Sequence, residues 1–180
     1  MNRVSLINLF ISDRGFKSYL ELGVYDKSTF NSISCNDKFS VDFKFDANFK
    51  GTTDDFFSIN KDKYDIIFID ANHTEPFLSR DIQNSLSILN KDGVVVCHDV
   101  NPPSEFHQAD ENNLYQTAWK AFVKYRFSGR HFTYSYPSDC GLGVIDTSLE
   151  RNVELLGAEH LNGLSYQDLD KNRAHLLGFK

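Results

Sequence analysis

The chain has 180 residues, with 25 Asp or Glu against 19 Lys or Arg, so its formal net charge is −6. A hydrophobic share of 41% supplies a core and excludes disorder as a description of the whole chain. The acidic balance argues against nucleic acid as a partner. No apolar run reaches membrane-spanning length and no apolar leader follows Met1, so we expect a cytoplasmic protein that does not bind membranes.

The sequence lacks repeats and long linkers, so we expect residues 1–180 to form a single domain. Its core is expected over residues 16–147, and a helical tail over 150–180 either docks on the sheet or pairs with a second subunit. The three cysteines, Cys35, Cys97 and Cys140, lie far apart and form no Cys-x-x-Cys pair. Reduced and mostly buried thiols are therefore expected.

Apolar patterns predict alternating helices and strands in chain order. The predicted elements are a helix over 4–12, strands at 18–24, 39–43 and 64–69, a helix with its apolar face at Leu78, Ile82, Leu86 and Leu89, a strand at 93–97, and helices over 114–125 and 166–177. Continuous apolar runs indicate strands that are buried on both faces. Residues 131–136 and 141–146, joined by a Pro-Ser-Asp-Cys turn, predict an antiparallel hairpin beside a parallel α/β sheet.

Ligands of open α/β sheets bind beyond the carboxyl ends of the strands, so the polar residues at those ends are the candidates. Gly23 ends the first strand, where it either lets a nucleotide approach the backbone or only permits a tight exit. Asp42 follows about twenty residues after the first strand, a spacing that suits an acid bonded to ribose hydroxyls. A solvated strand-end aspartate is the alternative. The dinucleotide pattern Gly-x-Gly-x-x-Gly is absent.

Residues 52–57 predict a loop that leads into a short helix, with Thr53 or Asp54 as its N-cap and the two phenylalanines as its buried face. The alternative places Asp54 or Asp55 at an adenine amino group, with Phe56 close to the ring.

Two aspartates and two histidines form the strongest group of candidates. Ile69-Asp70-Ala-Asn-His73 and Cys97-His98-Asp99 end adjacent strands, so these four ionisable side chains are expected to converge. A histidine could accept a proton near neutral pH, while Asp70 with Asp99 could instead hold a divalent cation. Hydrogen bonding to loop backbone is the third possibility.

Taken together, Tyr19-Leu-Glu-Leu-Gly23, Val41-Asp42, Thr53–Phe57, Tyr64–His73 and Leu89–Asp99 resemble the class I S-adenosylmethionine-dependent methyltransferases, over roughly residues 3–147. The resemblance implies a Rossmann-like, doubly wound α/β fold with a mostly parallel seven-stranded sheet, order 3-2-1-4-5-7-6. It further implies that Glu21 and Gly23 face the methionine part of the cofactor, Asp42 the ribose and Asp54 with Phe56 the adenine. Asp70 would lie near the sulfonium.

The resemblance implies methyl transfer from S-adenosylmethionine to a hydroxyl of a small molecule or sugar. His98 is the expected base and His73 the reserve, with Asp99 or Asp70 orienting the base or holding Mg²⁺. Related metal-dependent enzymes place an Asp-Asn pair where this chain has His98-Asp99, so one oxygen ligand becomes an imidazole. The loop at 101–108 and the segment after it are expected to recognise the acceptor. The glycine-poor loop after Gly23 leaves open a catalytically silent binding module with the same fold.

Overall fold

The computed structural model describes residues 1–108 and 115–180, and within them seven strands form a single sheet. The strands are β1 (Ser18–Leu22), β2 (Asp37–Asp42), β3 (Phe49–Lys50), β4 (Tyr64–Ile69), β5 (Leu89–Cys97), β6 (His131–Tyr136) and β7 (Leu142–Glu150). Their order is β3-β2-β1-β4-β5-β7-β6. β1 to β5 pair in parallel, whereas β7 runs antiparallel to β5 and β6. The predicted topology is confirmed.

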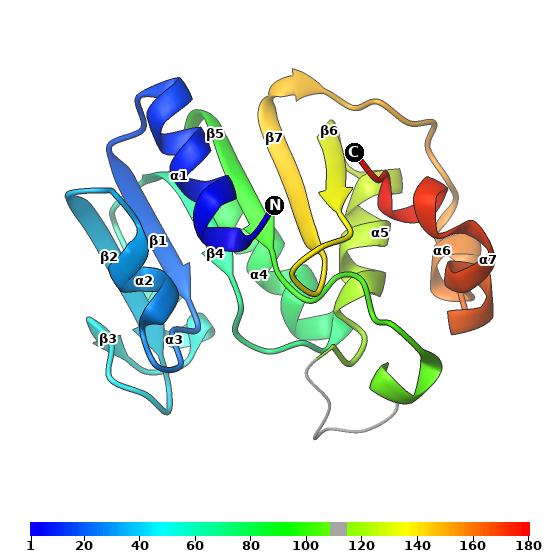
Figure 1. Ribbon diagram of the computed structural model, residues 1–180, viewed down its shortest axis with the longest axis horizontal. Helices are drawn as coiled ribbons and strands as arrows, with labels where there is room; N and C mark the ends of the chain where they lie inside the picture. The colour runs from blue at the N-terminus through cyan, green and yellow to red at the C-terminus, as the bar shows by residue number, and fades with distance from the viewer. Residues whose placement is uncertain (109–114) are drawn as a thin grey trace.

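Helices cover both faces of this sheet, as Figure 1 shows. They are α1 (Arg3–Arg14), α2 (Ser28–Ser32), α3 (Thr53–Ile59), α4 (Glu75–Ser87), α5 (Ala118–Ser128), α6 (Ala158–Asn162) and α7 (Tyr166–Leu177), with the 3₁₀ turn η1 at Glu105–Gln108. Helices α1 and α2 lie on one face of the sheet, and α3, α4 and α5 lie on the other face. The sheet is therefore doubly wound.

The two faces of β4 explain why its sequence is apolar without alternation. Ile66 and Phe68 belong to the core beneath α1, whereas Ile67 and Ile69 belong to the core shared with α4 and α5. All four side chains are at most 1% exposed. Burial of both faces requires apolar residues at every position of the strand.

Several boundaries differ from the sequence prediction, and three of them bear on the packing of the site. Leu89, predicted as the last apolar residue of a helix, instead begins β5, because the chain leaves helical geometry at Ile88. Its side chain is buried in either arrangement, so periodicity could not distinguish them. Phe43, predicted as a strand residue, lies beyond β2 and is 72% exposed. The N-cap of α3 is Thr52 and not Thr53 or Asp54. The short strand β3 was not predicted.

The last thirty residues pack beside α5 and reach the outer edge of the sheet. Helix α7 contacts α5, and the chain then forms a parallel bridge between Phe179 and Ser135 of β6. The Ser135 amide donates to the Gly178 carbonyl at 3.0 Å, and the Lys180 amide donates to the Ser135 carbonyl at 2.9 Å. These bonds cover part of the edge strand β6, which otherwise presents free backbone groups.

Within the described ranges, no helix combines the length and apolar character needed to cross a membrane. The predicted helix over 114–125 is observed as α5 from Ala118 onward, and Leu114 lies outside the described residues.

Candidate active site

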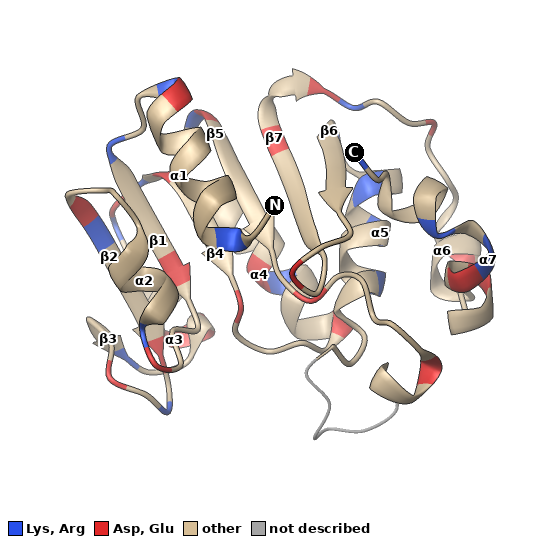
Figure 2. Ribbon diagram, viewed as in Figure 1, with Lys and Arg blue, Asp and Glu red and all other residues tan. Residues whose placement is uncertain are grey.

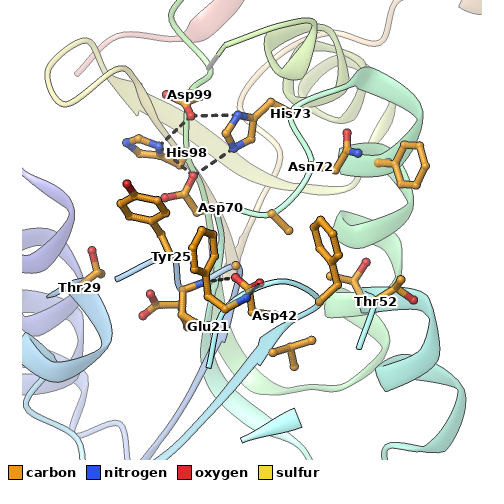
Figure 3. Close-up of a pocket in the computed structure, with 18 of the residues that line it drawn as sticks. Glu21, Tyr25, Thr29, Asp42, Thr52, Asp70, Asn72, His73, His98 and Asp99 are labelled. Atoms are coloured by element: carbon orange, nitrogen blue, oxygen red, sulfur yellow. Dashed lines mark hydrogen bonds and ion pairs between the residues drawn. The ribbon is translucent and has the colours of Figure 1, made fainter. Parts of the chain in front are cut away.

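A cavity of about 770 Å³ opens beyond the carboxyl ends of β1, β2, β4 and β5. Figure 3 shows its lining side chains converging from these strand ends. The residues predicted for the site that line it are Glu21, Gly23, Asp42, Asp54, Asp70, His73, His98 and Asp99. Phe56 is predicted for the site but is 3% exposed in the core between Phe39 and Phe49, away from the cavity lining.

Gly23 occupies a position that no other residue would fit. Its φ is +84°, in the left-handed region, and a Cβ there would lie 2.2 Å from the carbonyl oxygen of Asp70. Two backbone hydrogen bonds between neighbouring strands flank this position. The Gly23 amide donates to the Val41 carbonyl and the Asp70 amide donates to the Leu22 carbonyl, both at 2.8 Å. Gly23 therefore permits β1 and β4 to remain close where both strands open onto the cavity.

Asp42 organises the loops at the end of β2. One carboxylate oxygen accepts from the amides of Lys44 at 2.7 Å and Phe45 at 2.8 Å, and the other accepts from the Val24 amide at 2.9 Å. Burial alone would raise the pKa of Asp42, but these amide donors outweigh it and hold the pKa below its ordinary value. Asp42 is thus an ionised carboxylate that joins the loop after β1 to the loop after β2.

Glu21 is 1% exposed and lines the same cavity. Its carboxyl group accepts a hydrogen bond from the Tyr19 hydroxyl. Burial raises the pKa of Glu21 to about 8, and the Tyr19 bond only partly opposes this. A cationic group bound nearby would favour the ionised form.

The loop after β1 takes up left-handed backbone conformations without the expected glycines. Tyr25 has φ of 44° and Lys27 has φ of 62°, conformations that glycine adopts at lower cost. The Tyr25 ring packs edge-on against Phe45, with centroids 4.9 Å apart, and both rings line the cavity. Phe43 and Phe77 add two more rings to the lining. Sequence reasoning missed this aromatic wall.

The start of α3 reaches the cavity through Asp54. This carboxylate receives two bonds from the Arg80 guanidinium, at 2.6 and 2.7 Å. Asp55 instead completes a capping box with Thr52 and is absent from the cavity lining. The helix turns Phe56 into the core, because residues separated by two positions on a helix point in different directions.

Asp70, His73, His98 and Asp99 form one continuous cluster, as predicted (Figure 3). His98 Nδ1 lies 3.2 Å from Asp70 Oδ1 and 3.2 Å from Asp99 Oδ2. His73 Nε2 lies 3.3 Å from Asp70 Oδ1, and His73 Nδ1 lies 3.5 Å from Asp99 Oδ2. Each imidazole therefore lies beside two carboxylates.

The carboxylates favour protonated imidazoles. Burial lowers the pKa of His98, but hydrogen bonds to Asp139, Asp70 and Asp99 outweigh burial and raise it to about 12. His73 follows the same pattern, with a pKa raised by Asp70 and Asp99 against the effect of burial. The two histidines in turn hold the pKa of Asp70 well below its usual range despite its burial. The three carboxylates therefore favour the protonated form of His98.

The comparisons with known proteins agree with this architecture. A family profile described as a methyltransferase domain matches residues 40–100, from the second half of β2 to just beyond β5. Among solved structures, the chain resembles the Podospora anserina methyltransferase PaMTH1 bound to S-adenosylhomocysteine, with 17% identity, 80% and 77% of the two chains covered, and a TM-score of 0.62. The chain has the class I methyltransferase fold.

Two further structures of the same fold carry similar scores. An O-methyltransferase from Bacillus cereus in complex with S-adenosylhomocysteine has 14% identity, covers 80% of each chain and has a TM-score of 0.58. TomG, an O-methyltransferase from Streptomyces achromogenes in complex with S-adenosylmethionine, has 14% identity, covers 81% of this chain and 79% of its own, and has a TM-score of 0.60. No curated protein matches the sequence.

On this methyltransferase fold, sequence reasoning missed two charged residues that complete the cluster. Arg3, the first residue of α1, donates from Nη1 to Asp70 at 2.9 Å and from Nη2 to Asp139 at 2.8 Å. Asp139, in the turn between β6 and β7, also lies 3.5 Å from His98 Nε2. The turn is left-handed at Asp139 and Cys140, with φ of 52° and 62°, and Asp99 has φ of 58°. Such conformations cost energy and often concentrate at functional sites.

The predicted Mg²⁺ site does not fit the donors that are present. In the described part of the chain, two groups have ligand atoms within 4.8 Å of one another: Asp70, His73 and Asp99, and His98, Asp99 and Cys140. Each group includes nitrogen or sulfur, whereas Mg²⁺ prefers oxygen ligands only. Both oxygens of Asp70 already contact cationic side chains of the protein.

Proposed function

We propose that this protein transfers a methyl group from S-adenosylmethionine to an oxygen of a small acceptor. The observation that carries the proposal is the charge of the cavity, whose described lining includes six acidic residues against Arg3 and the two histidines, His73 and His98. A cationic sulfonium nucleoside complements such a lining, whereas the anionic pyrophosphate of a dinucleotide would be repelled. Structures with this fold, including PaMTH1 and TomG, hold S-adenosylhomocysteine or S-adenosylmethionine.

In this proposal, the cofactor lies between the loops that Asp42 joins. The Asp42 carboxylate accepts hydrogen bonds from the ribose hydroxyls, using acceptor capacity that its three amide donors leave free. Glu21 and the backbone of Gly23 face the methionine part, and Asp54 approaches the adenine amino group while paired with Arg80. Phe43 and Phe77 replace Phe56 as the aromatic neighbours of the adenine, because their rings line the cavity.

The bound cofactor supplies an electrophilic methyl group, and the protein supplies position and proton control. The acceptor hydroxyl is placed beside Asp70, His73 and Asp99, at the opposite end of the lining from Asp42. Holding the nucleophile in line with the methyl group supplies most of the rate of such a displacement.

We further propose that the neutral form of His73, which is reached above its raised pKa, receives the acceptor proton and that His98 serves to hold the carboxylates. The His73 side chain is 18% exposed and lines the cavity, whereas the His98 side chain is 4% exposed and surrounded by three carboxylates. A base must reach the proton it removes, and exposure of the side chain to the cavity favours His73. Its Nε2 atom is itself buried beside Asp70, so the imidazole must turn toward the acceptor to take the proton. Asp99 orients this imidazole through its Oδ2 atom. The other oxygen of Asp99, Oδ1, is buried and has no hydrogen-bond partner in the described residues.

A polar loop after β5 is the proposed contact with a small-molecule or sugar acceptor. Arg173 of α7 holds this loop by donating to the Asn101 side chain and the Pro102 carbonyl, both at 2.7 Å. Gln167 adds a bond of 2.9 Å to Glu105. The C-terminal helix therefore fixes the backbone of this loop, whose residues 101–108 are outside the lining of the cavity itself. We propose that residues 1–180 act as one domain.

A catalytically silent binding module is the second candidate. The observation that favours it is the mutual neutralisation of the cluster, in which carboxylates and imidazoles already contact one another. Cofactor binding without methyl transfer to any acceptor, in a screen of hydroxylated compounds, would support this second function.

Calorimetric titration with S-adenosylhomocysteine, S-adenosylmethionine and NAD⁺ tests the proposal. We expect the two sulfur nucleotides to bind and NAD⁺ not to bind. Asp42→Asn should weaken binding by about tenfold or more, because it removes a charged hydrogen-bond acceptor worth about 1.5–3 kcal/mol. Asp62→Asn, at an exposed residue outside the cavity, is the matched control and should bind as the wild type does. Binding of NAD⁺ alone would overturn the proposal.

A further inference from the structure

The guanidinium of Arg3 lies between two carboxylates from different parts of the fold. Nη1 donates to Asp70 Oδ2 at 2.9 Å, while Nε and Nη2 donate to the two oxygens of Asp139 at 3.1 and 2.8 Å. The backbone amide of Arg3 has no acceptor within the helix because it begins α1, and it donates instead to Asp139 Oδ2 at 2.6 Å. Figure 2 shows this basic start of α1 beside the acidic turn that follows β6. One residue thus joins α1, the end of β4 and the β6–β7 turn.

This arrangement neutralises the acid cluster from within the protein. Asp70 has one oxygen on Arg3 and the other beside the two imidazoles. Asp139 is bonded to Arg3 and lies near His98. Three carboxylates, Asp70, Asp99 and Asp139, therefore face one guanidinium and two histidines. A divalent cation held by Asp70, His73 and Asp99 would have to displace bonds that these side chains already make to Asp70.

We propose that Arg3 takes the place of a divalent cation at this cluster, so that the acceptor side of the site operates without a bound metal ion. A guanidinium is suited to this role because it stays charged and its planar donors match two carboxylates at once. The inference rests on the proposed function only in naming this end of the cavity the acceptor side. Its test requires neither cofactor nor turnover.

The same helix provides a matched control. Arg14, at the other end of α1, pairs with Asp146 of β7 through both of its terminal nitrogens. Both arginines therefore bridge α1 to an aspartate elsewhere in the fold, and their side chains are 25% and 28% exposed. Arg14 does not line the cavity. Loss of Arg14 should disturb the packing of α1 without freeing Asp70.

The experiment is a titration of Mn²⁺ into the chain of residues 1–180, first treated with a chelator, and it is followed by the electron paramagnetic resonance signal of the free ion. We expect no stoichiometric Mn²⁺ binding by the wild type or by Arg14→Met. Arg3→Met and Arg3→Gln should each gain one site, with affinity at least about tenfold above the wild type. Arg3→Lys, which keeps the positive charge, should behave as the wild type does.

Stoichiometric Mn²⁺ binding by the wild type would overturn the inference, whatever the variants do. So would a folded Arg3→Met or Arg3→Gln protein, verified by circular dichroism, that gains no site. A parallel titration with S-adenosylhomocysteine in the presence of chelator separates this inference from the proposed function. Failure to bind the nucleotide would count against the function and leave the Mn²⁺ result intact.

Discussion

Replacement of Gly23 by alanine should damage both the stability of the fold and the shape of the site. A Cβ at this position would lie 2.2 Å from the Asp70 carbonyl oxygen, 2.6 Å from its carbon and 2.8 Å from the Ala71 Cα. All three are backbone atoms of the adjacent chain segment, so no side-chain rotation can relieve the contacts. The end of β1 must instead separate from the segment that carries Asp70.

Two costs add in Gly23→Ala. Alanine in the left-handed region costs about 1–2 kcal/mol, and overpacking against rigid neighbours costs about 1–3 kcal/mol more. The expected loss in the free energy of unfolding is therefore about 2–5 kcal/mol. Displacement of Asp70 should also weaken S-adenosylhomocysteine binding, because the cavity wall moves with it.

Gly15→Ala separates the two costs. Gly15 has φ of +64° at the end of α1, and a Cβ there would meet no atom within 4 Å. This variant should lose only the backbone cost of about 1–2 kcal/mol. Urea denaturation of both variants and the wild type measures the difference. If Gly23→Ala loses no more stability than Gly15→Ala, the reasoning from the Asp70 contact is refuted.

Three further predictions concern Glu21, Thr52 and Arg173. In the folded protein the pKa of Glu21 is raised to about 8, from 4.5 in the unfolded chain. Between pH 4.5 and about 8 the folded protein therefore keeps a proton that the unfolded chain releases, so the free energy of unfolding falls as the pH rises through this range. Denaturation across that range should show Glu21→Gln losing less stability than the wild type, by up to about 1.4 kcal/mol per pH unit; equal slopes would contradict this. Thr52→Ala removes the capping box of α3 and should cost about 1 kcal/mol by urea denaturation, more than Ser58→Ala, whose hydroxyl only bonds to the Asp55 carbonyl. Arg173→Met should speed amide hydrogen exchange in the loop at 101–108, and unchanged exchange would exclude the clamp by α7.

The sequence predicted the sheet because its strands are buried on both faces. Continuous apolar runs such as Tyr64–Ile69 allow few other structures, and the resemblance then supplied the strand order. The boundary between α4 and β5 could not be predicted from the apolar pattern. Leu89 is buried both in a helix and in a strand, so its pattern did not separate the two.

The candidate site was predictable where its residues follow strands directly. Asp70 and Asp99 end adjacent strands, and the parallel pairing of β4 and β5 brings them together. Arg3 and Asp139 are 136 residues apart and belong to a helix start and a hairpin turn. No local pattern links them, so only the folded chain shows their contact. Of the two predicted placements of Phe56, the buried face of the helix is confirmed, and the contact with the cavity is not, because α3 directs this ring into the core.

A crystal structure of the protein grown with S-adenosylhomocysteine would test the central claim most directly. Our account predicts the nucleotide in the cavity at the ends of β1, β2 and β4, with its ribose hydroxyls on the Asp42 carboxylate and its amino-acid part toward Glu21 and Gly23. The acid cluster of Asp70, His73 and Asp99 should lie next to the sulfur. A nucleotide bound elsewhere, or bound here with its ribose away from Asp42, would contradict the account.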